Sequence, residues 1–495
     1  MATTMSFMED SKSMVPSQVL AGDERDSNYY PGSGTKIERS LVRRQDIRLI
    51  PLCASVYLMC FLDRSNIGNA QILNSESGDD LLQQTKISPH QYSGHGPYSI
   101  VLTLFYISYS LFEVPSNYYL KRVGPSKWIA FIMFCWGVLT IGSSGVTNFP
   151  SLAVTRLLLG IFEAGMYPGL VFYLTFWYRP EERSLRIAIF LASASLAGAF
   201  GGSIAYAVGH MNGVAGLVAW RWLFILEGIP SCLLAIVILL VLPDYPESAR
   251  WLNAEEKTLA ADRMKSCGSK GGDKAMTWDD TKKTLMEWRL YAHYLLYFLI
   301  SAPFSSLSLF IPAIVSGLGY TSLNAQLMTI PPYAVAYVVT LLVSWSADRF
   351  NSRALHAAAC ALIAAVGFIG LATLPPDAYL VGQSLRCFPH RYGMLVMSSA
   401  TVFASTPPLL SFLASNTHST ASTGLAVALN VTFGGGPGLL LGVWIYKPED
   451  AKGGYKVGNW VNAAFMLGIL VICSGLRWWY GRINRSSTVG RKYVL

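Results

Sequence analysis

The stretch "LIPLCASVYLMCFLDRSNIGNAQI", residues 49–72, begins with fourteen uncharged residues and continues directly into Asp63 and Arg64. Fourteen residues form a helix of about 21 Å, whereas the hydrocarbon core of a bilayer is about 30 Å thick and needs about 20 residues. A helix that crosses a membrane must therefore continue through the polar residues to about Ile72. The stretch predicts a first membrane-spanning helix that carries a charged pair in its interior.

The composition of the whole chain agrees with a membrane protein. Of its 495 residues, 52% are hydrophobic and 14% are charged, and the mean hydropathy is +0.38. An ordinary soluble domain has about 25% charged residues, so this chain has too few to cover a water-exposed surface. The cysteines and histidines show no metal-ligand spacing, and no motif of an enzyme active site occurs. We expect neither a metal nor a cofactor, and no enzymatic activity.

Twelve long apolar segments predict an all-α integral membrane protein with twelve transmembrane helices. The longest polar connection, residues 244–289, separates the segments six from six. The expected organisation is a cytoplasmic tail (1–46), a six-helix half (47–243), a cytoplasmic linker (244–289), a second six-helix half (290–481) and a cytoplasmic tail (482–495). Two proline pairs, Pro331-Pro332 and Pro407-Pro408, fall inside segments and should break or bend them.

The distribution of lysine and arginine predicts the orientation. Cations concentrate in the leader, in the even-numbered connections and in the tail, whereas the alternate connections are poor in them. By the positive-inside rule both termini are cytoplasmic, which agrees with an even number of spans. The net charge of +9 is therefore a topology signal and predicts no nucleic-acid partner. We expect a monomer in a lipid bilayer, the plasma membrane.

Two connections resemble each other and a known loop. "NYYLKRVGPSK" (117–127) and "SWSADRFNSR" (344–353) each place a cation at the mouth of a span and a second one four or five residues on. The pattern resembles the cytoplasmic loop of the major facilitator superfamily, Gly-x-x-x-Asp-Arg-x-Gly-Arg-Arg. The residues that this resemblance offers as gating-loop candidates are Asn117, Arg122, Asp348, Arg349 and Arg353.

Further motifs resemble one branch of that superfamily. "FLDRSNIGNA", "FEVPSN", "RLLLGIFEAGMYPG", "WYRPEERSLRIA" and "NTHSTASTGLAVALN" occur in the order found in the fungal anion:cation symporters, the allantoate-permease-like proteins. The resemblance implies the major facilitator fold and transport of allantoate, nicotinate, another vitamin-like carboxylate or a short peptide. The segment 382–390 makes one connection longer than this branch has. It is either a genuine outer loop or an artefact of the gene model.

Ionisable residues inside the spans are the candidate site, since a charge at mid-membrane costs about 2.5–3.5 kcal/mol on insertion scales. Arg156 and Glu163 lie two helical turns apart on one face, and Gly160 between them allows close helix approach. Asp63 and Asn66 share one face, while Arg64 points elsewhere. Either Asp63 pairs with Arg156, or Arg64 pairs with Glu163. Such pairs either lock the bundle or serve protons and substrate.

Other polar residues leave two interpretations open. Glu113 is either a charge at the gate or part of the transport site. Arg221 and Glu227 begin a span and are interpreted as reaching the interface. His418 is either structural or a coupling residue, and Asn430 is a candidate substrate contact on a polar face. The run "GGGPG" is interpreted as helix packing and a hinge.

Together these features predict a secondary transporter that carries a small organic anion with protons by alternating access. A carboxylate, Asp63 or Glu163, would bind the proton, and Arg64 or Arg156 would bind the anion. One alternative is efflux of a fungal secondary metabolite. The span-five sequence "ASLAGAFGGSIA" lacks the proline of the antiporter motif and favours import. The alternative from another class is a membrane sensor that transports nothing.

Overall fold

The computed structural model describes residues 36–87, 97–266, 278–320, 322–374, 387–417, 420–451, 453–486 and 493–494, and these parts contain helices but no strand. The first half consists of α1 (Lys36–Ile72), α2 (Leu81–Gln84), α3 (Pro97–Val123), α4 (Pro125–Ser143), α5 (Phe149–Glu163), α6 (Met166–Leu174), α7 (Pro180–Gly209) and α8 (Ala219–Val241). Two helices of the connecting segment follow, α9 (Ala254–Ser266) and α10 (Trp278–Met286). The second half consists of α11 (Trp288–Gly317), α12 (Ser322–Leu327), α13 (Ile330–Arg349), α14 (Arg353–Thr373), α15 (Cys387–Ser415), α16 (Thr420–Leu429), a π-helix (Asn430–Gly435), α17 (Gly436–Trp444) and α18 (Lys456–Ser486).

Twelve helices of the described chain are long and apolar enough to cross a membrane, as the sequence predicted. The first of them, α1, runs through Asp63 and Arg64 to Ile72 without interruption. It begins at Lys36, eleven residues before the predicted boundary at 47, because its polar first turns pack on the connecting segment. There, Arg44 lies 2.8 Å from Glu256 of α9.

The proline pairs behave differently from each other. Pro331 and Pro332 occupy the first turn of α13, which is separated from α12 by a short turn, so this span is broken as predicted. By contrast, α15 continues through Pro407 and Pro408. A further break that the prediction missed follows Glu163, where Ala164 leaves the helical region and Gly165 adopts a positive φ of 79°.

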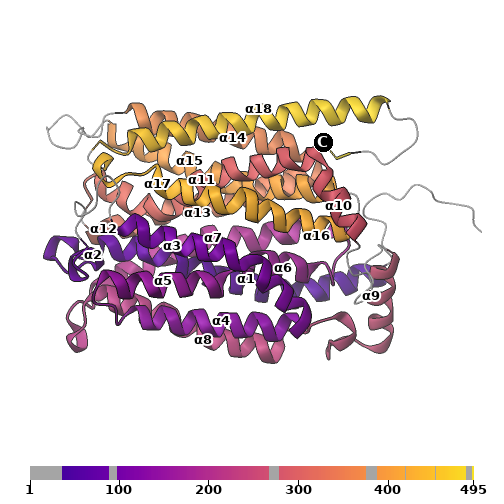
Figure 1. Ribbon diagram of the computed structural model, residues 1–495, viewed down its shortest axis with the longest axis horizontal. Coiled ribbons are helices and arrows are strands. Elements are labelled where there is room, and N and C mark those ends of the chain that lie inside the picture. The colour runs from indigo at the N-terminus through magenta and orange to yellow at the C-terminus, as the bar shows by residue number, and fades with distance from the viewer. Residues whose placement is uncertain are drawn as a thin grey trace, which may run out of the picture.

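The two halves lie side by side with their helices roughly parallel (Figure 1). Contacts between the halves join α1 to α11, α3 to α17 and α7 to α13, which are spans 1 and 7, 2 and 11, and 5 and 8. If each span is exchanged with the span six places later in the chain, the contact between spans 2 and 11 becomes the contact between spans 8 and 5. The contact between spans 1 and 7 is unchanged by the exchange. This is the pattern expected for repeated halves related by a two-fold axis.

The halves are in close contact at the end of the bundle where α2 and α12 lie, opposite the end with α9 and α10 (Figure 1). Gln326 donates a hydrogen bond of 3.1 Å to the carbonyl of Asn69, and the Trp444 indole donates one of 2.9 Å to Thr103. Gly202 approaches so closely that an added Cβ would lie 2.7 Å from the Gln326 carbonyl oxygen.

Candidate functional site

The polar patch of α1 is buried in the middle of the bundle. Asp63 is 1% exposed and Asn66 is fully buried, while the Arg64 side chain keeps 12% exposure. A helix has 3.6 residues per turn, so the adjacent Asp63 and Arg64 point in directions about 100° apart. The two charges therefore belong to two different surroundings, as the sequence indicated.

Arg64 and Glu163 form an ion pair between α1 and α5. Arg64 Nη2 lies 3.1 Å and Nε 3.3 Å from the same oxygen, Glu163 Oε2. The Cys60 thiol also approaches this oxygen, at 3.6 Å. The guanidinium carbon stacks 4.8 Å from the Tyr109 ring centroid and 5.3 Å from that of Phe105. Of the two pairings that the sequence left open, the structure forms this one.

A cavity of about 760 Å³, including space open to solvent, lies between the halves beside this ion pair. Arg64 is the one charged residue among those that line the cavity in the described structure. The other lining residues are mainly aromatic or aliphatic, with a few hydroxyls: Tyr57, Cys60, Phe61, Tyr109, Tyr167, Leu191, Tyr297, Ile300, Ser301, Phe304, Phe403, Thr406, Val431, Gly435 and Leu439.

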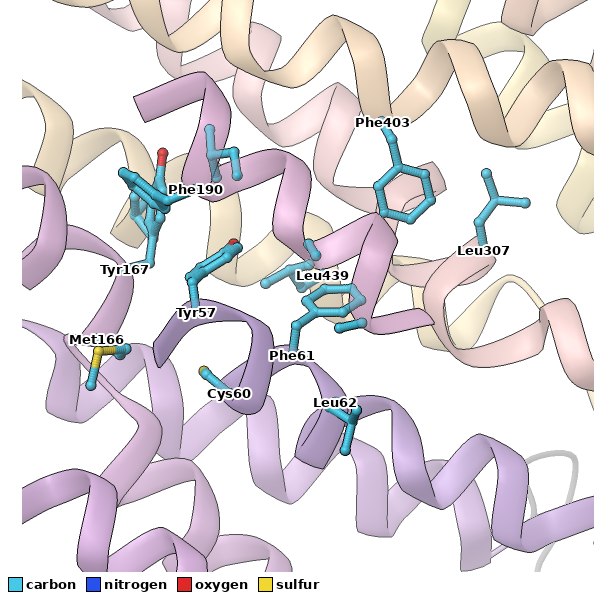
Figure 2. Close-up of a cluster of buried hydrophobic side chains, with 14 of the residues drawn as sticks. Tyr57, Cys60, Phe61, Leu62, Met166, Tyr167, Phe190, Leu307, Phe403 and Leu439 are labelled. Carbon is cyan, nitrogen blue, oxygen red and sulfur yellow. The ribbon is translucent and has the colours of Figure 1, made fainter. Parts of the chain in front are cut away.

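Figure 2 shows how both halves contribute to this wall. Tyr57 and Phe61 project from α1 and Tyr167 from α6, while Phe403 and Leu439 come from the second half. The Phe304 ring of α11 joins the two sides, 5.7 Å from Phe61 and 4.8 Å from Phe403 between ring centroids. The site is thus one cation in an aromatic enclosure.

Sequence reasoning missed the aromatic residues of this cavity. A signal for them existed in α1, where Tyr57, Phe61 and Arg64 are spaced i, i+4 and i+7, the spacing of one helical face. Tyr167 had no comparable signal, because it follows the break at Gly165 and the break changes the direction of the helix.

Asp63 and Arg156 do not form the other expected pair. Ser231 of α8 donates a hydrogen bond of 2.9 Å to Asp63 Oδ2. Arg156 is 2% exposed, and its guanidinium stacks on Phe224 at 5.7 Å from the ring centroid. Arg156 does not line the cavity in the described structure, so Arg64 is the arginine placed to meet an anion there. Gly160 does allow close approach, since a Cβ would lie 2.3 Å from the Phe105 carbonyl oxygen.

Two acidic residues are more deeply placed than expected. Glu113 is 1% exposed and is an electrostatic neighbour of Arg64, so it faces the interior of the bundle and not a loop. Glu227 is also 1% exposed, and its neighbours are Asp63 and Asn66. The interpretation of Glu227 as reaching the interface is therefore wrong: its side chain is buried where α8 packs on α1 and α4. Arg221 donates hydrogen bonds to the carbonyls of Ser144 and Val146 at the end of α4.

The second half meets the cavity with an irregular helix. Asn430, 2% exposed, begins the π-helix, whose Val431 and Gly435 line the cavity, but Asn430 itself does not. In "GGGPG", a Cβ on Gly438 would lie 2.5 Å from the carbonyl oxygen of Phe298, so close packing against α11 is confirmed. His418 lies outside the described residues, as do residues 382–386 of the long connection. Residues 387–390 belong to the start of α15.

The gating-loop candidates lie at the end of the bundle away from the closed contacts. Asp348 pairs with Arg353 at 3.3 Å, and Arg353 also donates to the Ser411 carbonyl at 3.2 Å. Asn117 donates to the Glu113 carbonyl at 3.2 Å. Arg122 and Arg349 are exposed. In the first half, Asp244 from the connecting segment accepts a 2.8 Å hydrogen bond from the backbone of Ser126 and so caps α4.

Two packed six-helix halves with a cavity between them define the class of multi-pass membrane transporters. The chain belongs to the Major Facilitator Superfamily, whose family model matches residues 53–443.

Several known proteins are similar to this chain. The MFS transporter prlL of a fungal species (strain NRRL 50135) is 57% identical over 449 residues, 91% of this chain and 88% of the relative. A putative tartrate transporter of Agrobacterium vitis is 30% identical over 441 residues, 88% of this chain and 93% of the relative. A bacterial homologue of the human lysosomal transporter Spinster, solved inward-facing and unoccupied, has a TM-score of 0.62 at 17% identity over 91% of this chain and 98% of its own. At that identity the likeness concerns the fold alone.

Proposed function

We propose that this protein is a proton-coupled carrier of a small organic anion that works by alternating access, with both termini in the cytoplasm. The observation that carries the proposal is the position of Arg64, a guanidinium facing an aromatic cavity between two repeated halves. Guanidinium binds carboxylate with two parallel hydrogen bonds, which gives it both energy and orientation. The resemblance to the anion:cation symporter branch and the similarity to a putative tartrate transporter support an anionic substrate.

The cavity also limits the shape of that anion. It offers one cation, four tyrosines and few other polar groups, so a second charge on the substrate would be buried without a partner. Aromatic rings favour a flat body that stacks or packs edge to face. A compact monocarboxylate with a planar ring, such as nicotinate, fits this wall better than a polar dianion.

The ion pair between Arg64 and Glu163 supplies the coupling. A substrate carboxylate and Glu163 compete for the same guanidinium, because Glu163 Oε2 occupies both Arg64 Nε and Nη2. When the anion takes Arg64, Glu163 is left ionised in a buried place, which is costly. Uptake of a proton by Glu163 removes that cost. One proton is therefore taken up at Glu163 with each anion, and it leaves when Glu163 regains Arg64.

Transport by the purified protein in liposomes tests the proposal. Nicotinate and its uncharged analogue nicotinamide form a matched pair, and allantoate and tartrate extend the panel. We expect accumulation of a monocarboxylate when the outside is acidic, its collapse on adding a protonophore, and no accumulation of nicotinamide. Equal transport of the neutral analogue, or indifference to the protonophore, would contradict the proposal. Accumulation only when the inside is acidic would assign the opposite direction, efflux.

A further inference from the structure

A second cluster of buried polar groups lies on the face of α1 that points away from the cavity. Asp63 and Asn66 of α1 meet Glu227 and Ser231 of α8, and the Trp136 indole of α4 lies beside them; all five are at most 1% exposed. None of these residues lines the cavity in the described structure. The cluster is therefore separate from the Arg64 site, although both start from adjacent residues of one helix.

The hydrogen bonds in this cluster are incomplete. The Ser231 hydroxyl donates to Asp63 Oδ2 at 2.9 Å, and Ser231 follows Glu227 by one helical turn, so both α8 side chains face α1. In the described part of the chain, Asp63 Oδ1, both carboxyl oxygens of Glu227 and both amide atoms of Asn66 have no hydrogen-bond partner. Most buried polar atoms in native proteins have a hydrogen-bond partner, so these five atoms require an explanation.

The surrounding charges do not balance the two carboxyl groups. Neither Asp63 nor Glu227 takes part in an ion pair of the described residues. The nearest cation is Arg156, an electrostatic neighbour of Asp63. Helix α7, which packs on both α1 and α8, has no titratable residue between Arg186 and Tyr206. The remaining titratable groups that act on the pair are Cys60 of α1, Glu163 of α5 and Cys232 of α8.

Two ionised carboxylates beside one arginine leave one uncompensated negative charge out of water. Such a charge is much more costly than a neutral, protonated carboxyl. Two carboxyl groups in one site do not ionise independently, and the pair holds its first proton more tightly than either group would alone. One proton shared by the pair makes the cluster neutral together with Arg156. The protonated carboxyl oxygen can also donate a hydrogen bond to a carboxylate oxygen that has no partner.

We propose that Asp63 and Glu227 form a second proton-binding site, between α1 and α8, and hold one proton between them. This site rests on the proposed function for its role in transport, but its shared proton can be measured in the absence of a substrate. Because Asp63 precedes Arg64 in the same helix, a rotation of α1 that alters the Arg64–Glu163 pair also moves Asp63 relative to Glu227. The second proton is thereby linked to the same movement without touching the anion.

Infrared spectroscopy of the purified protein in lipid tests the site without a substrate. A protonated carboxyl has a carbonyl band that ionised carboxylates lack, and a pH titration of this band follows the shared proton. We expect the wild type to show such a band at neutral pH and Glu227→Gln and Asp63→Asn each to lose it. Ser231→Ala, a milder change, should shift it, because Ser231 donates to Asp63. Glu255→Gln, the same chemical change at an exposed position of α9, should leave it unchanged.

The results separate this proposal from the proposed function. If neither Glu227→Gln nor Asp63→Asn changes the band, and Ser231→Ala does not shift it, the shared proton is ruled out whatever the protein transports. If the band behaves as expected, nicotinate uptake in liposomes then measures the coupling. Glu227→Gln should carry one proton fewer per anion than the wild type, with a flatter pH profile, and an unchanged ratio would rule out a role of this site in transport. A wild type that moves no protons would overturn the proposed function and the transport role of the site, but not the shared proton itself.

Discussion

The two halves of this protein share a fold and differ in chemistry. The first half buries two arginines and four carboxyl groups inside its spans: Asp63, Arg64, Glu113, Arg156, Glu163 and Glu227. In the described second half the acidic residues lie only at span ends or in connections, and the buried polar groups of the span interiors are hydroxyls, amides and the His293 imidazole of α11. The second half instead has a π-helix, two proline pairs and glycines packed on α11. The ionisable groups are thus concentrated in one half, and the other half is marked by irregular and closely packed helices.

The strongest test of this division is Arg64→Lys. Lysine keeps the charge but loses the planar fork, so the bond to an anion weakens by about 2–3 kcal/mol. Uptake efficiency should fall by about 30- to 150-fold. Initial rates of nicotinate uptake in liposomes measure this fall in efficiency. The matched control is Arg485→Lys, the same substitution at an exposed position at the end of α18. A change of less than threefold would remove Arg64 from the anion site.

The next largest effect is expected for Glu163→Gln, which keeps the shape of the side chain and removes its charge. The proton can no longer be exchanged at this position, so accumulation driven by an acidic outside should fall. Exchange of internal for external anion needs no net proton movement and should remain. Uptake measured from pH 5 to pH 8 should rise less steeply toward acid in the variant than in the wild type, because only the site between Asp63 and Glu227 still exchanges a proton. A variant with the same pH profile as the wild type would remove Glu163 from proton coupling.

A substitution in the closely packed second half should lower the stability of the protein. In Gly442→Ala the added Cβ would lie 2.4 Å from the Ala302 carbonyl oxygen, and overpacking of this kind costs about 1–3 kcal/mol. Thermal unfolding of the detergent-solubilised protein should show a lower midpoint. Gly475→Ala is the control, because nothing lies within 4 Å of its Cβ and alanine favours a helix. Equal midpoints for the two variants would mean that α17 can move away from α11 at no cost.

The smallest effect is expected for Thr406→Val, which removes a hydroxyl from the cavity wall of the second half at nearly constant shape. A neutral hydrogen bond is worth about 0.5–1.5 kcal/mol, so the KM for nicotinate should rise by about two- to twelvefold. The pH profile should not change. If this variant lost more uptake than Arg64→Lys, the division between the halves would be wrong.

The sequence predicted the fold because span length, charge distribution and an even span count constrain one another. The stretch before Asp63 was too short to cross a bilayer, and α1 does continue to Ile72. The break after Glu163 was not predicted, although "EAGMYPG" contains Gly165, Pro168 and Gly169, because the apolar residues on both sides fit a continuous span. The structure shows the break in the backbone of Ala164 and in the positive φ of Gly165.

The sequence identified the buried charged residues better than their contacts. A charged residue inside a span is costly to bury, so it stands out in the sequence as a candidate functional residue. Asp63, Arg64, Arg156 and Glu163 could be identified in this way. Which of them pair depends on helix rotation, and that is set by packing that a single sequence does not specify. Glu227 was misplaced for a related reason: its distance from the start of α8 indicated the interface, while its side chain is buried where α8 packs on α1 and α4. Proton and substrate roles for all of these residues stay predictions.

The interruption between α5 and α6 has a mechanical consequence. Glu163 is the last residue of α5, and two backbone torsions, at Ala164 and Gly165, join it to α6. A continuous helix would transmit any tilt of α5 to the cavity wall, but this joint lets α6 turn separately. Tyr167 lies on the far side of the joint, in the cavity wall, and the ion pair that ties α5 to α1 ends at the joint itself. In the proposed mechanism, an anion that releases Glu163 would therefore act at the joint that connects α5 to the cavity wall.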